Sequence, residues 1–527
     1  MENKRVCIVG AGVSGLAVCK QLLARGFRPV VFEAGPTVGG VWRHTPASTR
    51  LQTARWDYEF SDFRWPETVT EVLPNHEQVM EYLESYAHRF DLLRHVRFGE
   101  KVVGVEYVGV TEEEMKAWDL WSGTGGAFGG GRRGVWHVTV QREDEPVQVH
   151  VMDFLILCIG IFSGLPNIPT FPKNKGHEVF KGKVIHFMDY SNMESTAAAE
   201  LVKGKRVIVV GYLKSALDIA AECANINGSK YPCTMIIRSK RWNVNTFLAW
   251  GIPIHYMFFS RFSELLRHKP GEGLMLSLIA TLLSPLLWIF AKFTESYLLK
   301  TIPMKKYEMV PKQRFFEDVF GGQISLFPEN FYEKVEEGSI ILKPSKTFEF
   351  YKDGILAEGE TTPMETDLVI YATGFKGDQK IRNIFFSPWF QEIVGGTDTP
   401  IPLYRDIIHP HIPQMAIIGY KEGISGIFTS ELRARWLACF LDDGIVLPSR
   451  RSMEKDITEW DEFYKKYACG SRKFYRRSSI IPFHTWYHDQ LCKDMGSNPR
   501  RKKGFLKDLF VPYSPADYAG LEFEKKK

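Results

Sequence analysis

The sequence predicts an α/β fold with two parallel-sheet domains, the second inserted into the first. Two segments carry this prediction, "RVCIVGAGVSGLAVCKQLLARG" (5–26) and "RVIVVGYLKSALDIAAECA" (206–224). Each starts with a short apolar run, turns at a glycine and continues with apolar residues at helical spacing, as in a buried strand followed by a helix that packs on the sheet. A third apolar run, "TDLVIYATGF" (366–375), also ends in a glycine turn. We assign it to the return of the chain to the first domain.

The length of the chain and its connectors predict the domain boundaries. A chain of 527 residues is too long for one compact core, so two or three domains are expected. The proline-punctuated connector "GLPNIPTFP" separates the first two. The expected boundaries are 1–165 for the first part of the first domain, 166–335 for the second domain with an apolar insertion at 242–302, 336–445 for the second part of the first domain, and 446–527 for a C-terminal extension.

Composition and charge are those of an ordinary folded protein. The apolar fraction is 44%, the charged fraction is 24% and the formal net charge is +5. A charge this small over this length gives no reason to expect nucleic acid as a partner. The basic run "PRRKK" (499–503) is expected to be solvated surface.

The cysteines predict neither a metal site nor a redox-active disulfide. They stand at positions 7, 19, 158, 223, 233, 439, 469 and 492, without CxxC or zinc-ligand spacing. Scattered cysteines of this kind are typical of reduced thiols in a reducing compartment. Because the chain opens on a charged tetrapeptide and a strand, no signal peptide is expected and a cytoplasmic location is predicted.

One segment is a candidate for membrane contact. "LMLSLIATLLSPLLWIF" (274–290) is uncharged, but its 17 residues are at the lower limit for a span and Pro285 lies inside it. A buried helix, or one that dips into a membrane surface such as the cytosolic face of the endoplasmic reticulum, fits better than a spanning helix.

The first glycine turn, "GAGVSG", has the features of a dinucleotide site. Gly10 allows the tight turn out of the strand, Gly12 lets the backbone approach a pyrophosphate, and Gly15 lets the helix pack closely. The pyrophosphate would lie on the helix N-terminus, where free N–H groups favour negative charge. Glu33 ends the next strand, at the interval expected for the residue that binds the ribose 2′-hydroxyl. The predicted binding residues are Gly10, Ala11, Gly12, Val13, Ser14, Gly15 and Glu33.

The residues after Glu33 favour FAD over NAD at this first Rossmann-like site. They read "AGPTVGGVW", and the glycine pair at 39–40 brings the backbone close to a ligand a few residues beyond the ribose. This continuation is typical of FAD proteins rather than dehydrogenases. Gly40 and Trp42 therefore join the predicted FAD site.

The second turn, "GYLKSA", is an altered copy of the first. Leu213 stands where the fingerprint has its second glycine, so the pyrophosphate is expected to lie slightly farther out. Lys214 could compensate with a direct charge, and the small residues that follow keep the helix start accessible. The predicted binding residues here are Gly211, Tyr212, Leu213, Lys214, Ser215 and Ala216.

A basic strand end assigns the nucleotide of the second site. In "CTMIIRSKRW", Arg238 falls where an acidic residue would otherwise be expected, with Lys240 and Arg241 beside it. An acid would repel a 2′-phosphate, whereas an arginine can pair with it through two hydrogen bonds. The pattern therefore predicts NADPH at the second site; an ordinary basic strand end without a ligand is the alternative.

Between the two units lies "FKGKVIHFMDY" (180–190), which matches FxGxxxHxxxY. With "GAGVSG" before it, "GYLKSA" after it and "YATGF" at 371–375, the chain resembles the flavin-containing monooxygenases over nearly its whole length. Two stretches, "LQTARWDYEFSDFRWP" and "MEYLESYAHRFDLL", are similar to the immunity-associated plant branch that N-hydroxylates pipecolic acid. In the family the 180–190 segment links the domains, and we assign His186 no proton transfer.

The resemblance implies an activity and its participants. NADPH reduces FAD, reduced FAD and O₂ form a C4a-hydroperoxide, and one oxygen atom passes to a small-molecule amine or sulfide, as in N,N-dimethylaniline monooxygenases. Because the cofactor carries the chemistry, no triad or metal is required. Family members place an Asn near the flavin before "FxDFPFP"; Gln52 stands there in this chain and is the candidate catalytic residue.

Two alternatives remain open. Baeyer–Villiger oxygenation of a ketone is disfavoured by Tyr190, because that class has Trp at this position of the motif. A flavoprotein that binds FAD and NADPH without oxygenating, as a redox sensor or peroxide source, is kept open by Leu213 and Gln52. The sequence does not predict an oligomeric state.

Overall fold

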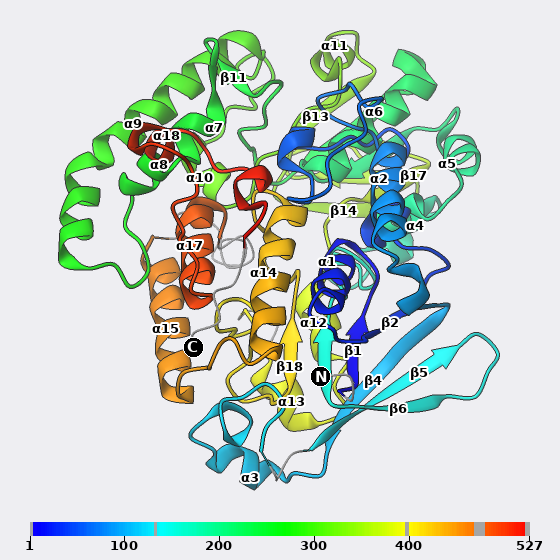
Figure 1. Cartoon of the computed structure of the whole chain (residues 1–527). Helices are drawn as coiled ribbons and strands as arrows, with labels where there is room; N and C mark the ends of the chain where they lie inside the picture. Colours follow the sequence, from blue (N-terminus) through cyan, green and yellow to red (C-terminus); the bar gives the residue numbers. More distant parts are fainter. Residues whose placement is uncertain (1–3, 131–133, 396–399, 468–479, 522–527) are drawn as a thin grey trace.

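The protein is described from a computed structural model that covers residues 4–130, 134–395, 400–467 and 480–521. Figure 1 colours the elements by their position in the chain, and the red helices near the C-terminus lie beside the green helices of the apolar insertion. Two separate five-stranded sheets form the centres of the two domains. The predicted α/β class is confirmed, and so is the insertion of one domain into the other.

The first domain is built on a five-stranded parallel sheet in the order β18-β7-β1-β2-β3. The strands are β1 (Val6–Val9), β2 (Val30–Glu33), β3 (Val96–Phe98), β7 (Phe154–Leu157) and β18 (Met415–Ile417). Helix α1 (Val13–Leu23) follows β1 and packs against α14 (Gly426–Leu441). Every residue of β1 and β7 is buried, as expected for strands covered on both faces.

The second domain has its own parallel sheet in the order β13-β10-β9-β17-β8. The strands are β8 (Lys183–His186), β9 (Val207–Val210), β10 (Cys233–Ile237), β13 (Ile340–Pro344) and β17 (Leu368–Tyr371), and α6 (Lys214–Asn227) follows β9. Both β13 and β17 lie beyond the predicted boundary at residue 335. The run at 366–375 therefore belongs to the second sheet, between β9 and β8, and the chain re-enters the first sheet only at β18. The sequence pattern of a short buried apolar strand does not indicate which sheet the strand joins, so the correct sheet could not be predicted.

Two small antiparallel sheets and several helices complete the domains. One sheet contains β4 (Glu100–Val108), β5 (Val135–Arg142) and β6 (Gln148–Met152); the other contains β14 (Phe348–Tyr351), β15 (Gly354–Ala357) and β16 (Met364–Glu365). The helices are α2 (His76–Arg89), α3 (Glu112–Ala117), α4 (Phe187–Ser191), α5 (Ser195–Val202), α10 (Phe315–Phe320), α11 (Phe331–Glu336), α12 (Gly377–Arg382) and α13 (Pro388–Ile393). Helix α2 begins with a capping box between Asn75 and Gln78, which satisfies two helix-end groups.

The apolar insertion lies between β10 and β13 and ends in the longest helix described. It contains β11 (Leu248–Ala249), β12 (Ile252–Pro253), α7 (Ile254–Phe258), α8 (Arg261–Leu265) and α9 (Leu274–Thr301). Within the described residues α9 is the one helix long and apolar enough to cross a membrane, and 17% of its most apolar window is buried. The C-terminal extension adds α15 (Arg450–Tyr467), α17 (His484–Asp494) and α18 (Phe505–Phe510). Helices α17 and α18 pack on α8, so the extension joins the insertion to the first domain.

Candidate functional site

The first glycine turn has the close backbone approaches that a pyrophosphate site requires. Gly10 has a φ of +102°, and a Cβ there would lie 2.7 Å from the carbonyl oxygen of Cys158. A Cβ on Gly15 would lie 1.9 Å from the carbonyl oxygen of Gly10. A Cβ on Gly12 would lie 3.3 Å from the Cα of Gly40, so the 39–40 backbone passes directly over the start of α1. The free N–H groups at residues 13–15 face this narrow turn without helical partners, which suits an anion.

Glu33 is fixed at the carboxyl end of β2. Its two oxygens accept hydrogen bonds from the backbone N–H groups of Ala11 at 2.7 Å and Gly35 at 2.8 Å. A carboxylate has about four acceptor sites, so lone pairs remain for a ribose hydroxyl. The geometry of the first turn and of this carboxylate therefore fits the adenosine half of FAD.

The outer residues of the predicted FAD site contact neighbouring elements. Trp42 donates its indole N–H to Tyr58 Oη at 2.7 Å. The Ser14 hydroxyl lies 3.0 Å from that of Ser430 on α14. Val13 is the first residue of α1 and is half-buried against the domain core. The contact with α14 is not predictable from the sequence, because nothing in the sequence of α14 resembles a nucleotide motif.

Lys380 on α12 is a further residue near the first turn that no sequence pattern predicts. Its Nζ donates to the carbonyl oxygen of Ile159 at 2.6 Å and to Ser163 Oγ at 2.9 Å, just beyond the end of β7. Burial lowers the pKa of Lys380 to about 8, and the nearby charge of Glu33 opposes this shift. No motif identifies such a lysine, because a long-range contact brings it to the site.

The second turn reproduces the backbone of the first without its middle glycine. Gly211 has a φ of +144°, and a Cβ there would lie 2.7 Å from the carbonyl oxygen of Ala372. Leu213 is the N-cap of α6 with φ −110° and ψ −175°, close to the φ −77° and ψ −170° of Gly12 at the start of α1. This extended conformation is open to any residue, so Leu213 causes no backbone strain. Ser215 is half-buried and Ala216 is buried against the turn.

Two residues of this turn are already engaged within the protein. The Tyr212 side chain is buried in the second domain, with its hydroxyl 3.4 Å from that of Tyr332. Lys214 Nζ donates to Asp218 Oδ1 at 2.5 Å. The sequence predicts that Lys214 could offer its charge directly to the pyrophosphate. The structure corrects this expectation, because a buried carboxylate one helical turn away already matches that charge.

Arg238 lies one residue beyond the predicted position. Gly10 N bonds to Phe32 O and Gly211 N bonds to Ile236 O, so the counterpart of Glu33 is Ile237. Arg238 follows it and is exposed, with no ion pair among the described residues. Its side chain is therefore available for a phosphate at the edge of the site.

The neighbouring Arg241 is not available to a phosphate. It forms an ion pair with the buried carboxylate of Asp318 at 2.9 Å, and this carboxylate also accepts from the backbone N–H of Trp242 at 2.9 Å. Of the two arginines in "RSKR", Arg238 is therefore the one that can bind a 2′-phosphate.

Gln52 and His186 have different surroundings. Gln52 is exposed, and its Oε1 accepts from the backbone N–H of Leu326 in the second domain at 3.4 Å. His186 is the N-cap of α4, where its Nδ1 accepts from the Met188 N–H at 3.1 Å. Burial lowers the pKa of His186, so the ring is neutral at physiological pH. These contacts give His186 a structural role and place Gln52 at the domain junction.

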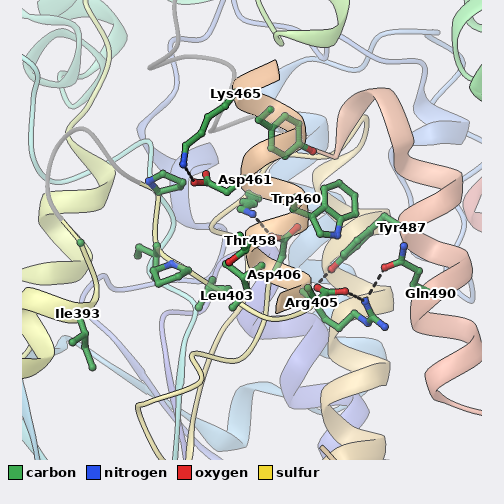
Figure 2. A pocket seen from close by; sticks show the side chains of 18 residues that line it. Ile393, Leu403, Arg405, Asp406, Thr458, Trp460, Asp461, Lys465, Tyr487 and Gln490 are labelled. Atoms are coloured by element: carbon green, nitrogen blue, oxygen red, sulfur yellow. Dashed lines mark hydrogen bonds and ion pairs between the residues drawn. The ribbon is translucent and has the colours of Figure 1, made fainter. Parts of the chain in front are cut away.

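A cavity of about 350 Å³ lies apart from both turns, between the 400–406 segment, α15 and α17 (Figure 2). Its charged side chains pair with one another: Arg405 with Asp456 at 2.9 Å, and Lys465 with Asp461 at 2.9 Å. None of the predicted nucleotide-binding residues lines it. We assign this cavity no role in cofactor binding.

The described residues contain no group of three His, Cys, Asp or Glu side chains that could hold a metal ion. The seven cysteines among them are buried free thiols, and Cys469 lies outside the described residues. Burial raises the pKa of Cys19 to about 12, which keeps its thiol protonated.

Comparison with known proteins agrees with this geometry. Residues 3–512 match the model of the family "Flavin-binding monooxygenase-like". "Probable flavin-containing monooxygenase 1" of Arabidopsis thaliana is 41% identical over 100% of this chain and 98% of its own length. "Dimethylaniline monooxygenase [N-oxide-forming] 2" of Mus musculus is 26% identical over 96% of this chain and 85% of its own length.

Among solved structures, a complex titled OTEMO with FAD and NADP has a TM-score of 0.64 at 18% identity, covering 94% of this chain and 98% of that one. At this identity the likeness supports the fold, with its two dinucleotide-binding domains. The 41% identity to the plant relative and the match to the family model also establish the family. The chain belongs to the flavin-containing monooxygenases, which are NADPH-dependent oxidoreductases that bind FAD.

Proposed function

We propose that this monooxygenase transfers its oxygen atom to a nucleophilic nitrogen of a small molecule, with sulfur as the second acceptor and N-hydroxylation of pipecolate as the specific reaction to test. The observation that carries the proposal is the motif at 180–190, which ends in Tyr190 rather than Trp. The similarity to a relative named N-oxide-forming supports nitrogen as the acceptor. A small amine or sulfide and O₂ are then the substrates.

The residues of the chain bind and orient the cofactors. The α1 turn holds the FAD pyrophosphate and Glu33 the ribose, while the α6 turn and Arg238 hold NADPH. Bound FAD supplies the redox and oxygen chemistry. Gln52 lies at the junction of the two domains, and we propose that its amide hydrogen-bonds to the flavin or to NADP. Exclusion of water at this junction would limit the release of hydrogen peroxide.

The test uses FAD-loaded protein, NADPH, O₂ and a panel of pipecolate, a tertiary amine, a sulfide and a cyclic ketone. Products are identified by mass spectrometry, and NADPH consumption is compared with hydrogen peroxide release. An N-oxygenated product formed in proportion to NADPH supports the proposal. A lactone from the ketone would instead indicate a Baeyer–Villiger enzyme. Peroxide equal to the NADPH consumed with every compound would indicate a non-oxygenating flavoprotein.

We also propose that the protein is cytoplasmic and contacts a membrane surface, such as the cytosolic face of the endoplasmic reticulum, through 274–290. No charged residue lies between Leu274 and Ala291. Six large apolar side chains of this stretch are exposed: Leu274, Met275, Leu278, Leu282, Trp288 and Ile289. An exposed apolar face of this size on a helix that is half-packed on the protein suits a helix lying in the lipid interface.

Helix α18 offers a second apolar surface beside α8. Phe505 and Leu506 are exposed, with the exposed Lys503 and Lys507 close by in sequence. Phe510 packs against Phe262 of α8, with ring centroids 5.0 Å apart. Exposed aromatic and aliphatic side chains next to lysines favour an anionic lipid surface.

The basic run at 499–503 is only in part the solvated surface that the sequence predicts. Arg500 forms an ion pair with Asp508 and Lys502 with Asp517, at 2.7 Å and 2.8 Å. Lys503 is exposed. Arg501 donates only to a backbone carbonyl, that of Asp517 at 3.2 Å, so its charge is not matched by a carboxylate. The exposed lysines beside this surface are Lys503 and Lys507.

Flotation with vesicles of phosphatidylcholine and phosphatidylserine tests the membrane proposal. We expect wild-type protein to float with the vesicles. The double variant Leu278→Asp/Leu282→Asp is expected to remain at the bottom of the gradient. Val446→Asp is the matched control, because Val446 is 80% exposed on a loop outside this surface. Wild-type protein that stays below with every vesicle composition would refute the membrane contact.

A further inference from the structure

One segment of the first domain reaches across to the second, and we call residues 44–52 the clasp. Ser48 Oγ donates to Glu222 Oε2 at 3.1 Å, and Thr49 Oγ1 donates to Asp218 Oδ2 at 2.7 Å. Both carboxylates lie on α6, one helical turn apart and so on the same face. The clasp thus binds the very helix whose N-terminus forms the second nucleotide turn.

Asp218 is hydrogen-bonded both to the second nucleotide turn and to the clasp. One of its oxygens accepts from Lys214 at the second turn, and the other accepts from Thr49 of the clasp. The side chain is almost fully buried, with a relative exposure of 2%. Burial raises the pKa of Asp218, while the hydrogen bonds from Lys214 and Thr49 oppose that shift. A buried carboxylate is costly unless it is paired, so these two bonds fix its position.

The residues just before the clasp are tied to the first turn. Gly39 N donates to Ala11 O at 3.1 Å, and Gly40 lies over Gly12. The clasp begins four residues after Gly40. One short stretch of backbone therefore runs from the FAD turn to the helix of the NADPH turn.

Two further contacts join the clasp to the second domain. His44 at its start interacts with the side chain of Asn192. Gln52 at its end accepts from the backbone N–H of Leu326. The contacts on α6 lie between these two, so the second domain contacts the clasp near both ends and in the middle. The backbone of residues 49–51 is bonded to the first domain, where His76 N donates to Thr49 O at 3.1 Å and Leu51 N to Pro74 O at 3.0 Å.

We propose that the clasp sets the separation between FAD and NADPH, with Asp218 and Thr49 as its positioning residues. Two domains of one chain are expected to move relative to one another unless the interface between them is large and apolar. Hydride transfer from NADPH to FAD requires the two rings in close contact, and a misplacement of ~1 Å can slow a reaction about 100-fold. Polar bonds from a segment anchored at the FAD turn supply this constraint.

The test compares two threonine variants in the clasp. Thr49→Val removes the bond to Asp218, whereas Thr45→Val is the matched control, because Thr45 Oγ1 bonds only locally, to Val41 O at 2.9 Å. FAD-loaded proteins are mixed anaerobically with saturating NADPH, and flavin reduction is followed by absorbance. Hydrogen–deuterium exchange of 44–52 and α6, without NADPH, provides a readout independent of activity.

Thr49→Val is expected to slow the limiting rate of flavin reduction by about tenfold or more, as the loss of a hydrogen bond to a buried charge can. Exchange of 44–52 and of the first turns of α6 should rise, while the Kd for NADP⁺ changes less than the rate. Thr45→Val should match wild type in every readout. If Thr49 were merely structural, Thr49→Val would lower the melting temperature but would not slow flavin reduction more than it changes the Kd for NADP⁺.

Wild-type reduction and exchange in Thr49→Val would overturn the proposal, as would equal losses in the two threonine variants. If Thr49→Val does not retain FAD, Ser48→Ala replaces it, because that bond is exposed and its loss leaves Asp218 paired. Ser48→Ala is expected to change the same two readouts in the same direction by a smaller factor. No change in Ser48→Ala would then overturn the proposal.

Discussion

Arg238 is exposed directly after the end of β10, whereas Arg241 close by is paired with Asp318. We expect Arg238→Ala to weaken the binding of NADPH about 10- to 100-fold, since a bidentate charge-assisted contact contributes about 1.5–3 kcal/mol. NADH lacks the 2′-phosphate, so its affinity should change little. Titration of both nucleotides against FAD-loaded protein measures the ratio.

Lys230→Ala is the control for Arg238→Ala, because it removes one exposed positive charge from the same domain. It should leave the ratio between NADPH and NADH unchanged. An Arg238→Ala protein that still discriminates between the two nucleotides like wild type would contradict the assignment.

Leu213 tests whether the missing glycine limits the second site. Its extended backbone, with φ −110° and ψ −175°, does not require glycine, so Leu213→Gly removes only side-chain bulk next to the phosphate path. The affinity for NADPH should stay within about threefold of wild type or become tighter, because a surface change away from special backbone angles has a small effect. A large loss of affinity in Leu213→Gly would show that the turn geometry is different.

At the scale of elements, α17 begins on a carboxylate from another part of the chain. Glu264 of α8 accepts from the backbone N–H groups of Thr485 and Trp486, at 2.9 Å and 3.0 Å. Burial raises the pKa of Glu264 to about 7. The insertion is thus bonded to the C-terminal extension by a buried acid that holds its proton to a higher pH than an exposed glutamate does.

Because the pKa of Glu264 is raised, its contribution to the free energy of unfolding falls as pH rises. Between pH 4.5 and about 7 the folded state holds the proton of Glu264 more tightly than the unfolded state, so its contribution is lost as pH rises through this range. The full shift corresponds to about 3 kcal/mol. We expect Glu264→Gln, which keeps an acceptor oxygen for α17, to lose less stability than wild type between pH 5 and 7.

Urea unfolding at several pH values measures the effect of Glu264→Gln. Glu333→Gln, at an exposed position, is the control and should follow the wild-type curve. Identical pH dependence in wild type and Glu264→Gln would rule out a raised pKa at this acid.

At the scale of the whole molecule, local patterns predicted the two nucleotide units and their order. The glycines at 10 and 15 are required by contacts within a few residues of the turn or with the adjacent strand, so their spacing is visible in the sequence. The positions of Lys380 and Asp218 follow from long-range contacts, which leave no local pattern. The same reason explains the wrong boundary at 335: the four apolar residues of β17 would be buried equally well in either sheet.

The corrected boundary can be tested with two fragments that start at the same residue. A fragment of residues 166–335 lacks β13 and β17, and β17 lies between β9 and β8 in the second sheet. A fragment of residues 166–375 contains all five strands. We expect the longer fragment to unfold cooperatively and to bind NADP⁺, and the shorter one to lack a cooperative transition, because removal of an interior strand exposes the buried edges of its neighbours. Circular dichroism during heating and NADP⁺ titration measure both properties. A shorter fragment that folds and binds as well as the longer one would mean that β17 is not required by the second domain, and would restore the boundary at 335.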